Sequence, residues 1–177
     1  MNSLFKDKNV IYTHNKQSDL RKDKIKILNN YLLFNEILGD SDINIITDSR
    51  LNKFDLRDLT NQVKNTHKIF STEDEKKRGG VTILIKKEAK IRIKFFNSFK
   101  SENDGPRAIF IKAETEDNNS LGIAGLYVSP SNKTASFKEI EQFITSSFCI
   151  AKVDFKIVCG GFNIDPQRDE KNQKKKQ

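Results

Sequence analysis

Several features that mark particular classes of protein are scarce or missing in this chain of 177 residues. It has no Trp, one Met, three Pro and two Cys. No apolar run approaches the roughly 18 residues that a membrane-spanning helix needs. The opening residues MNSLFKDKNV contain no apolar core of the kind found in secretory signals. We therefore expect no membrane association.

The two cysteines, Cys149 and Cys159, lie in apolar surroundings on either side of the last predicted strand. Their spacing is neither CxxC nor that of a zinc site, which predicts buried, reduced thiols rather than a disulfide or a metal centre. An intracellular location follows.

Other functional signatures are also missing. The sequence has no glycine-rich phosphate loop, no zinc-ligand spacing, no GxSxG elbow and no internal repeat. With no Trp and only three Tyr, the thirteen Phe are expected to fill the core rather than to stack on nucleic-acid bases.

The chain has the length of one domain with a real core, and its formal net charge is +8. We expect residues 1–169 to form a single domain and residues 170–177 to be a disordered basic tail. The positive charge favours an anionic partner, and DNA or RNA contact and simple solubility fit it equally well.

Short apolar runs predict strands, and two stretches predict helices. Residues 43–47 (INIIT) are apolar throughout, as in a strand buried on both faces. After residue 19, apolar residues recur at helical spacing and predict a first helix. Ser136 begins a capping-box pattern, and the apolar face of a second predicted helix follows it. The remaining strands are predicted at residues 9–13, 81–85, 90–94, 108–113, 121–128 and 153–158.

One of these strands, KIRIK at residues 90–94, alternates strictly and therefore predicts a half-exposed strand with a cationic outer face. A solvated face is one interpretation, and contact with a phosphate backbone is the other. The candidate nucleic-acid contacts are Lys90, Arg92 and Lys94 on this strand and Lys174, Lys175 and Lys176 in the tail.

The last strand and its turn are the centre of the functional interpretation. Residues 153–158 stop at Gly160-Gly161, and Asn163 follows two residues later. Polar side chains at the carboxyl end of a core strand are where α/β proteins place chemistry. The alternative is a strand, a Gly-Gly turn and a solvated loop.

The stretch CGGFNIDPQRD resembles the GDFN-x(2)-P-x(2)-RD motif of the endonuclease/exonuclease/phosphatase superfamily, and in particular its LINE-type retrotransposon endonucleases. Four further elements appear in the family's order: Asn15 after the first strand, Asp48 in ITDSRL, the strand RGGVTILI, and Tyr127 in a Y-x-P-like turn. The resemblance implies an α/β sandwich of two mixed β-sheets flanked by helices (DNase I-like), shortened at its C-terminal end.

In that family the acid at the Asp48 position binds the catalytic Mg²⁺, the Tyr lies beside the scissile phosphate, and the Asp of GDFN activates water. Here Gly161 stands at the position of that Asp, although Asn163 is present. Asp48 is one methylene shorter than the family's Glu, and Arg50 is expected to neutralise part of its charge. The family's late Asp-His pair has no counterpart, because neither His14 nor His67 lies in that region.

These departures predict a catalytically inactive nuclease-like protein that needs no cofactor. We expect a nucleic-acid-associated or scaffolding subunit of a larger, DNA-modifying assembly, such as a DNA methyltransferase with accessory subunits, and a nuclear location. Protein subunits are expected to cover the incomplete second sheet. One alternative is an active Mg²⁺-dependent endonuclease or phosphodiesterase whose missing groups come from elsewhere. The other is a module that binds only proteins.

Overall fold

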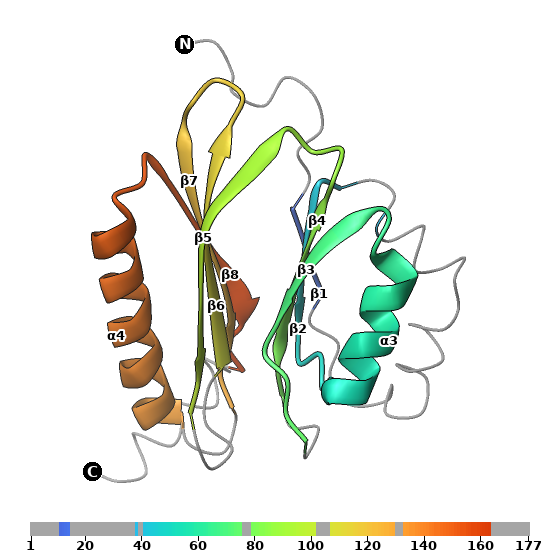
Figure 1. The fold of residues 1–177 in the computed structure, drawn as a ribbon. Helices are drawn as coiled ribbons and strands as arrows, with labels where there is room; N and C mark the ends of the chain where they lie inside the picture. The colour runs from blue at the N-terminus through green and yellow to red at the C-terminus, as the bar shows by residue number, and fades with distance from the viewer. Residues whose placement is uncertain are drawn as a thin grey trace, which may run out of the picture.

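The apolar runs form two four-stranded β-sheets that face each other in a computed structural model (Figure 1). The structure describes residues 11–14, 38, 41–75, 79–101, 107–129 and 133–163. Asn15, the helix predicted after residue 19 and the tail with Lys174, Lys175 and Lys176 lie outside the described residues.

The first sheet has the order β1-β2-β4-β3. Its central strands, β2 and β4, pair in antiparallel fashion, and β1 runs parallel to β2. β3 pairs with β4 on the other side. The four strands are β1 (Ile11–His14), β2 (Ile43–Thr47), β3 (His67–Ser71) and β4 (Val81–Lys86).

The second sheet has the order β5-β6-β7-β8. The first three strands form an antiparallel meander, and β8 runs parallel to β7. Both sheets are therefore mixed, as predicted. The strands are β5 (Ile91–Lys100), β6 (Arg107–Thr115), β7 (Ser120–Tyr127) and β8 (Phe155–Gly161).

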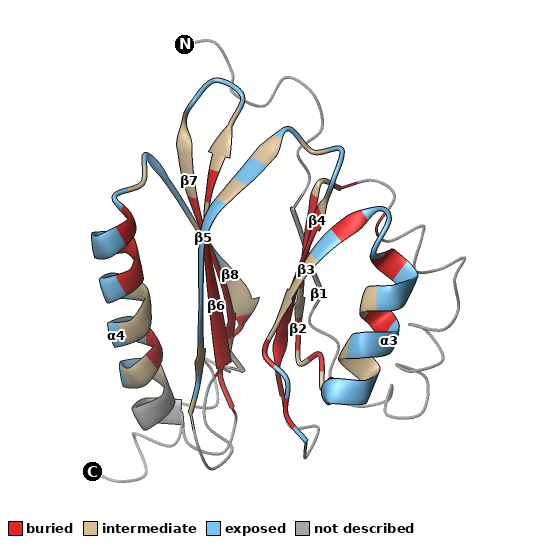
Figure 2. Cartoon of the chain, viewed as in Figure 1, coloured by how far each residue is buried: buried red, intermediate tan, exposed pale blue. Residues whose placement is uncertain are grey.

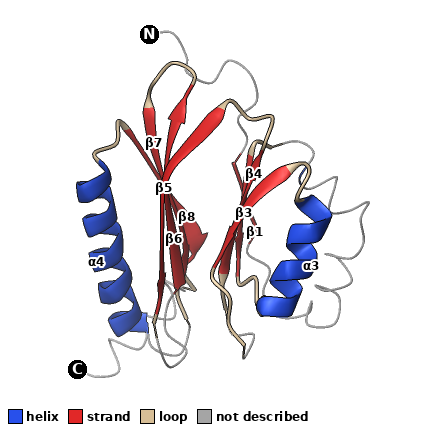
Figure 3. Ribbon diagram, in the orientation of Figure 1, coloured by secondary structure: helices blue, strands red, loops and turns tan. Residues whose placement is uncertain are grey.

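The core lies between the two sheets, where mostly β-branched side chains from both inner faces interdigitate. Among the described residues, a helix covers the outer face of each sheet (Figures 2 and 3): α3 (Lys53–Val63) lies on the first sheet and α4 (Lys133–Ala151) on the second. This confirms the predicted α/β sandwich. The buried residues between the sheets are Ile43, Ile45, Val81, Ile83, Ile85, Ile109, Ile111 and Ile123.

Several local predictions were wrong. β3 was missed because its sequence HKIFS mixes polar and apolar residues without alternation. The helix α4 begins at Lys133, so Ser136 lies within its first turn and does not cap it. β5 continues through the aromatic cluster to Lys100, and Phe95 and Phe96 are both more than 40% exposed.

Both cysteines are free, as predicted, but Cys149 is exposed rather than buried. β8 forms one edge of its sheet, and Phe155 and Val158 on that strand are 40% and 46% exposed. None of the described helices is long and apolar enough to cross a membrane.

Candidate functional site

Four strand ends meet at one end of the sandwich and carry most of the predicted site residues. Asp48 follows β2, and Gly79-Gly80 precede β4, which runs antiparallel to β2. In the opposite sheet, β7 and β8 are parallel and end side by side at Tyr127 and Gly161. We call the set formed by Asp48, Arg50, Tyr127, Gly161 and Asn163 the strand-end site.

The Asp48 carboxylate is held by a neighbour in the chain. Arg50 donates from Nε to one carboxylate oxygen at 2.8 Å and from a terminal nitrogen to the other at 3.0 Å. The Asp48 side chain is 15% exposed and that of Arg50 is 36% exposed. The hydrogen bond to Asp48 raises the pKa of Arg50, against the opposing effect of burial. The predicted neutralisation of Asp48 by Arg50 thus takes the form of a two-pronged ion pair.

The backbone around this pair adopts an unusual conformation. Asp48 and Arg50 have φ of 55° and 51°, the left-handed region that residues other than glycine seldom visit. Two backbone hydrogen bonds hold the loop: Ser49 N–H donates to Gly80 O at 3.2 Å, and Arg50 N–H to Gly79 O at 2.7 Å. Such strain concentrates at functional sites and persists only where the surroundings fix it.

The glycine pair before β4 allows Tyr127 to pack against this loop. A Cβ atom on Gly79 would lie 2.4 Å from Cε1 of the Tyr127 ring, and one on Gly80 would lie 2.7 Å from Ser49 Oγ. Both glycines have positive φ, at 61° and 121°. The two glycines of the RGGVTILI motif therefore pack directly against the strand-end site.

On the second sheet, Gly161 and Asn163 close the site. Gly161 is the register partner of Tyr127, and its carbonyl accepts from Val128 N–H at 2.9 Å. Asn163 has φ of 48° and donates from Nδ2 to Val128 O at 2.7 Å. The position expected for a catalytic carboxylate is therefore a buried glycine beside Tyr127.

The described residues do not fit a Mg²⁺ site. Magnesium requires oxygen ligands, above all carboxylates. Both oxygens of Asp48 accept hydrogen bonds from Arg50, and Gly161 has no side chain. No group of three His, Cys, Asp or Glu in the described part of the chain is placed to hold a metal ion.

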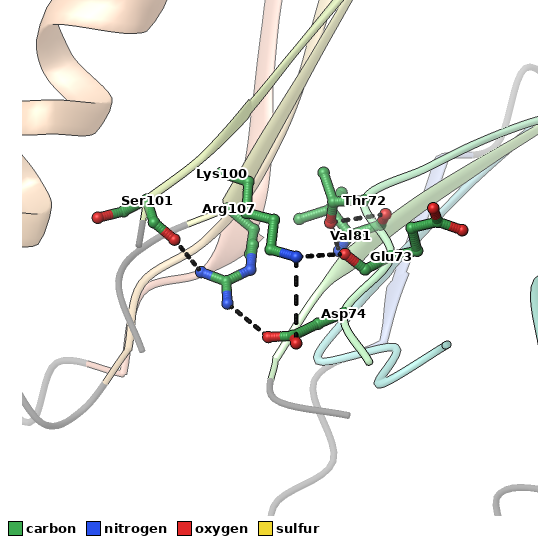
Figure 4. A network of polar contacts seen from close by, with 7 residues as sticks. All are labelled: Thr72, Glu73, Asp74, Val81, Lys100, Ser101 and Arg107. Carbon is green, nitrogen blue, oxygen red and sulfur yellow. Dashed lines mark hydrogen bonds and ion pairs between the residues drawn. The ribbon is translucent and has the colours of Figure 1, made fainter. Parts of the chain in front are cut away.

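A second ion pair, which the sequence did not reveal, joins the two sheets at the same end (Figure 4). Arg107, the first residue of β6 and the register partner of Tyr127, donates to Asp74 at 2.9 Å and to Ser101 O at 3.3 Å. The two side chains are only 1% and 6% exposed. Lys100 Nζ lies 4.0 Å from the same Asp74 carboxylate. The available signal was an arginine directly before the apolar run AIFI of β6.

The predicted cationic strand face lies elsewhere. Lys90 donates to Glu116 at 2.7 Å, and Arg92 and Lys94 share Glu114 at 2.8 and 3.0 Å. Hydrogen bonds with these partners raise the pKa of Lys90 and, from Lys94 first, lower that of Glu114. All three cations are near the start of β5, whereas the strand-end site is near its end.

This separation is large. Eight residues along β5 from Arg92 to Lys100 correspond to about 26 Å at a rise of about 3.3 Å per residue. Three cations against two carboxylates also leave one net positive charge on that face. The structure therefore does not bring the cationic face and the strand-end site together.

Comparison with solved structures identifies the fold. An endonuclease/exonuclease/phosphatase family protein from Bacteroides thetaiotaomicron superposes with a TM-score of 0.65 at 13% identity, over 89% of this chain and 63% of that one. D. rerio TDP2 complexed with a single-strand DNA product superposes with a TM-score of 0.58 at 10% identity, over 87% of this chain and 59% of that one. ANGEL2, a 2',3'-cyclic phosphatase, superposes with a TM-score of 0.60 at 12% identity, over 80% of this chain and 45% of that one.

The chain thus has the DNase I-like fold of these enzymes and spans about six-tenths or less of the length of each of the three. No protein-family model matches its sequence, and no curated protein matches it by sequence. At such low identity the likeness shows the fold alone.

Proposed function

We propose that this protein is a nucleic-acid-associated subunit without nuclease activity of its own, which acts in a larger, DNA-modifying assembly in the nucleus. The observation that carries the proposal is Gly161, the buried register partner of Tyr127. Glycine has no side chain to accept a proton or to orient a water molecule.

Nucleic-acid contact is supported by charge and by the structural neighbours. The sequence has a net charge of +8, and the described exposed cations include Lys90, Arg92 and Lys100. The D. rerio TDP2 neighbour was solved with a single-strand DNA product. Phosphate contacts of this kind give affinity without sequence preference.

A protein partner is supported by the surface of β8. This edge strand exposes Phe155 on one face and Val158 on the other, and no further strand pairs with its outer side among the described residues. Exposed strand edges are typical of surfaces that another chain covers.

The loss of catalysis is tested with supercoiled, linear and abasic DNA in Mg²⁺ or Mn²⁺. We expect no cleavage by the wild-type chain, and no robust cleavage by Gly161→Asp, because Asp48 remains engaged by Arg50. Metal-dependent cleavage that disappears in Asp48→Ala and in Asn163→Ala would refute the proposal and favour an active enzyme.

Nucleic-acid contact is tested by measuring affinity against salt for the assembled complex. Each phosphate contact on duplex DNA contributes a slope of about −0.9. We expect the triple variant Lys90→Glu, Arg92→Glu and Lys94→Glu to bind more weakly and with a shallower slope. If affinity and slope are unchanged while the complex stays assembled, the cationic face on β5 does not contact the nucleic acid.

A further inference from the structure

We propose that the Arg50 guanidinium takes the place of a divalent cation at Asp48, so that the strand-end site contacts a phosphate group without metal. The inference rests on the proposed function, since it names the ligand class of the same site. Its central observation is that the chain itself supplies a cation to the carboxylate on which metal binding would depend.

The ion pair engages both carboxylate oxygens of Asp48, the atoms through which it would bind a metal. Arg50 engages the two oxygens separately, at 2.8 and 3.0 Å, in the fork geometry that suits guanidinium and carboxylate. A metal ion would have to displace both charge-assisted bonds and would then lie beside a positive charge. At the position beside Tyr127, Gly161 offers no second carboxylate to favour it.

The loop is built to keep this pair together. Both residues have left-handed backbone angles, and the intervening Ser49 is buried and bonded to Gly80 O. Arg50 is also bonded to Gly79 O through its backbone. The contact between the Asp48 and Arg50 side chains is thus held by backbone hydrogen bonds to both glycines that precede β4.

The arrangement leaves Arg50 able to meet an anion. Its side chain is 36% exposed, so it can be reached from solvent while it remains paired with Asp48. Guanidinium groups are well suited to phosphate oxygens. Asp48 offsets this attraction, so its neutralisation should strengthen phosphate binding. A metal-dependent site predicts the opposite, because there the carboxylate holds the cation that attracts the phosphate.

The first experiment measures Mn²⁺ binding to the full chain by electron paramagnetic resonance. Wild type should show no Mn²⁺ binding that depends on Asp48, Arg50→Gln should gain a weak site at this carboxylate, and Asp48→Asn/Arg50→Gln should lose it again. Arg57→Gln, which removes an exposed arginine on α3, is the matched control and should behave like wild type. Two outcomes would overturn the inference. One is that wild type binds Mn²⁺ and that Asp48→Asn abolishes this binding. The other is that Arg50→Gln keeps the wild-type circular dichroism spectrum but gains no Mn²⁺ site.

The second experiment does not depend on folding of the Arg50 variant. Fluorescence anisotropy is measured with a single-stranded oligonucleotide, with and without a 5′-phosphate, in EDTA and in Mg²⁺. Wild type should bind equally in both buffers, and Asp48→Asn should bind several-fold more tightly. A preference for the phosphorylated end would identify a terminal phosphate as ligand, and equal affinity would identify internal phosphodiesters. Binding that EDTA weakens, that Asp48→Asn weakens, or that is absent in wild type would overturn the inference.

The two proposals can fail separately. Wild type that binds Mn²⁺ at Asp48 but cleaves nothing refutes the inference and leaves the proposed function standing. Metal-dependent DNA cleavage by wild type refutes the proposed function itself.

Discussion

The buried ion pair between Arg107 and Asp74 gives the sharpest stability prediction. It joins β6 of the second sheet to the segment after β3 of the first, at 2.9 Å and with both side chains nearly inaccessible. Asp74→Ala leaves the guanidinium buried without its carboxylate. Arg107→Met leaves the Asp74 carboxylate with one remaining cation nearby, since Lys100 Nζ is 4.0 Å from it. Both variants should therefore be less stable, and Asp74→Ala more so.

The magnitude follows from the geometry. At 2.9 Å and an effective dielectric constant of about 20, the attraction is about 6 kcal/mol, most of which offsets the desolvation of the two groups. Removing one partner of such a buried pair costs about 3–5 kcal/mol, against a total of about 5–15 kcal/mol for a typical domain. Replacing both, as in Asp74→Leu/Arg107→Met, should cost little, because no buried charge remains.

The assay is urea unfolding followed by circular dichroism. With a slope of about 2 kcal/mol per molar urea, the midpoint of Asp74→Ala should fall by about 1.5–2.5 M. The control is Asp58→Ala, whose partner Arg57 is 3.8 Å away in a pair with both side chains about two-thirds exposed. That change should cost less than about 1 kcal/mol. If Asp74→Ala costs no more than Asp58→Ala, the pair does not hold the sheets together and the reasoning is wrong.

Three further predictions concern single side chains. Gly79→Ala should lower the free energy of unfolding by about 2 kcal/mol or more, since its Cβ would meet the Tyr127 ring, and the loss should shrink in a Tyr127→Ala background. Burial, and then the charge of Lys86, lower the pKa of His67 below the usual 6.5. As the pH falls, the unfolded chain therefore protonates this histidine before the folded chain does. Stability in urea should therefore fall as the pH drops below 6.5, and His67→Gln should flatten that fall. Burial raises the pKa of the Cys159 thiol, so the exposed Cys149 should react first with a thiol reagent at neutral pH, and Cys149→Ser should remove the fast phase.

The architecture could be predicted because its central strands are continuous apolar runs. β2 and β4 are almost wholly buried, and residues of that kind have one stable placement, between two layers. β3 has one buried residue out of five, so its pairing with β4 is decided by the partner strand and leaves little trace in its own sequence.

The site could be predicted only where its chemistry is local. Arg50 lies two residues from Asp48, and their contact was anticipated from that spacing. Arg107 and Asp74 are 33 positions apart, and only the folded sheets bring them together. The ion pairs of the cationic face could not be predicted for the same reason, because Glu114 and Glu116 reach it from the neighbouring strand and turn and offset most of its charge.

The close approach of Gly79 to Tyr127 and of Gly80 to Ser49 shows that a motif can be required for folding independently of catalysis. A side chain at either glycine would collide with its neighbour whether or not the protein hydrolyses a phosphodiester. Selection for folding alone is therefore enough to retain the RGG strand, whether or not turnover persists. Genome surveys that count nucleases by this strand would count members of the fold whatever chemistry each of them performs.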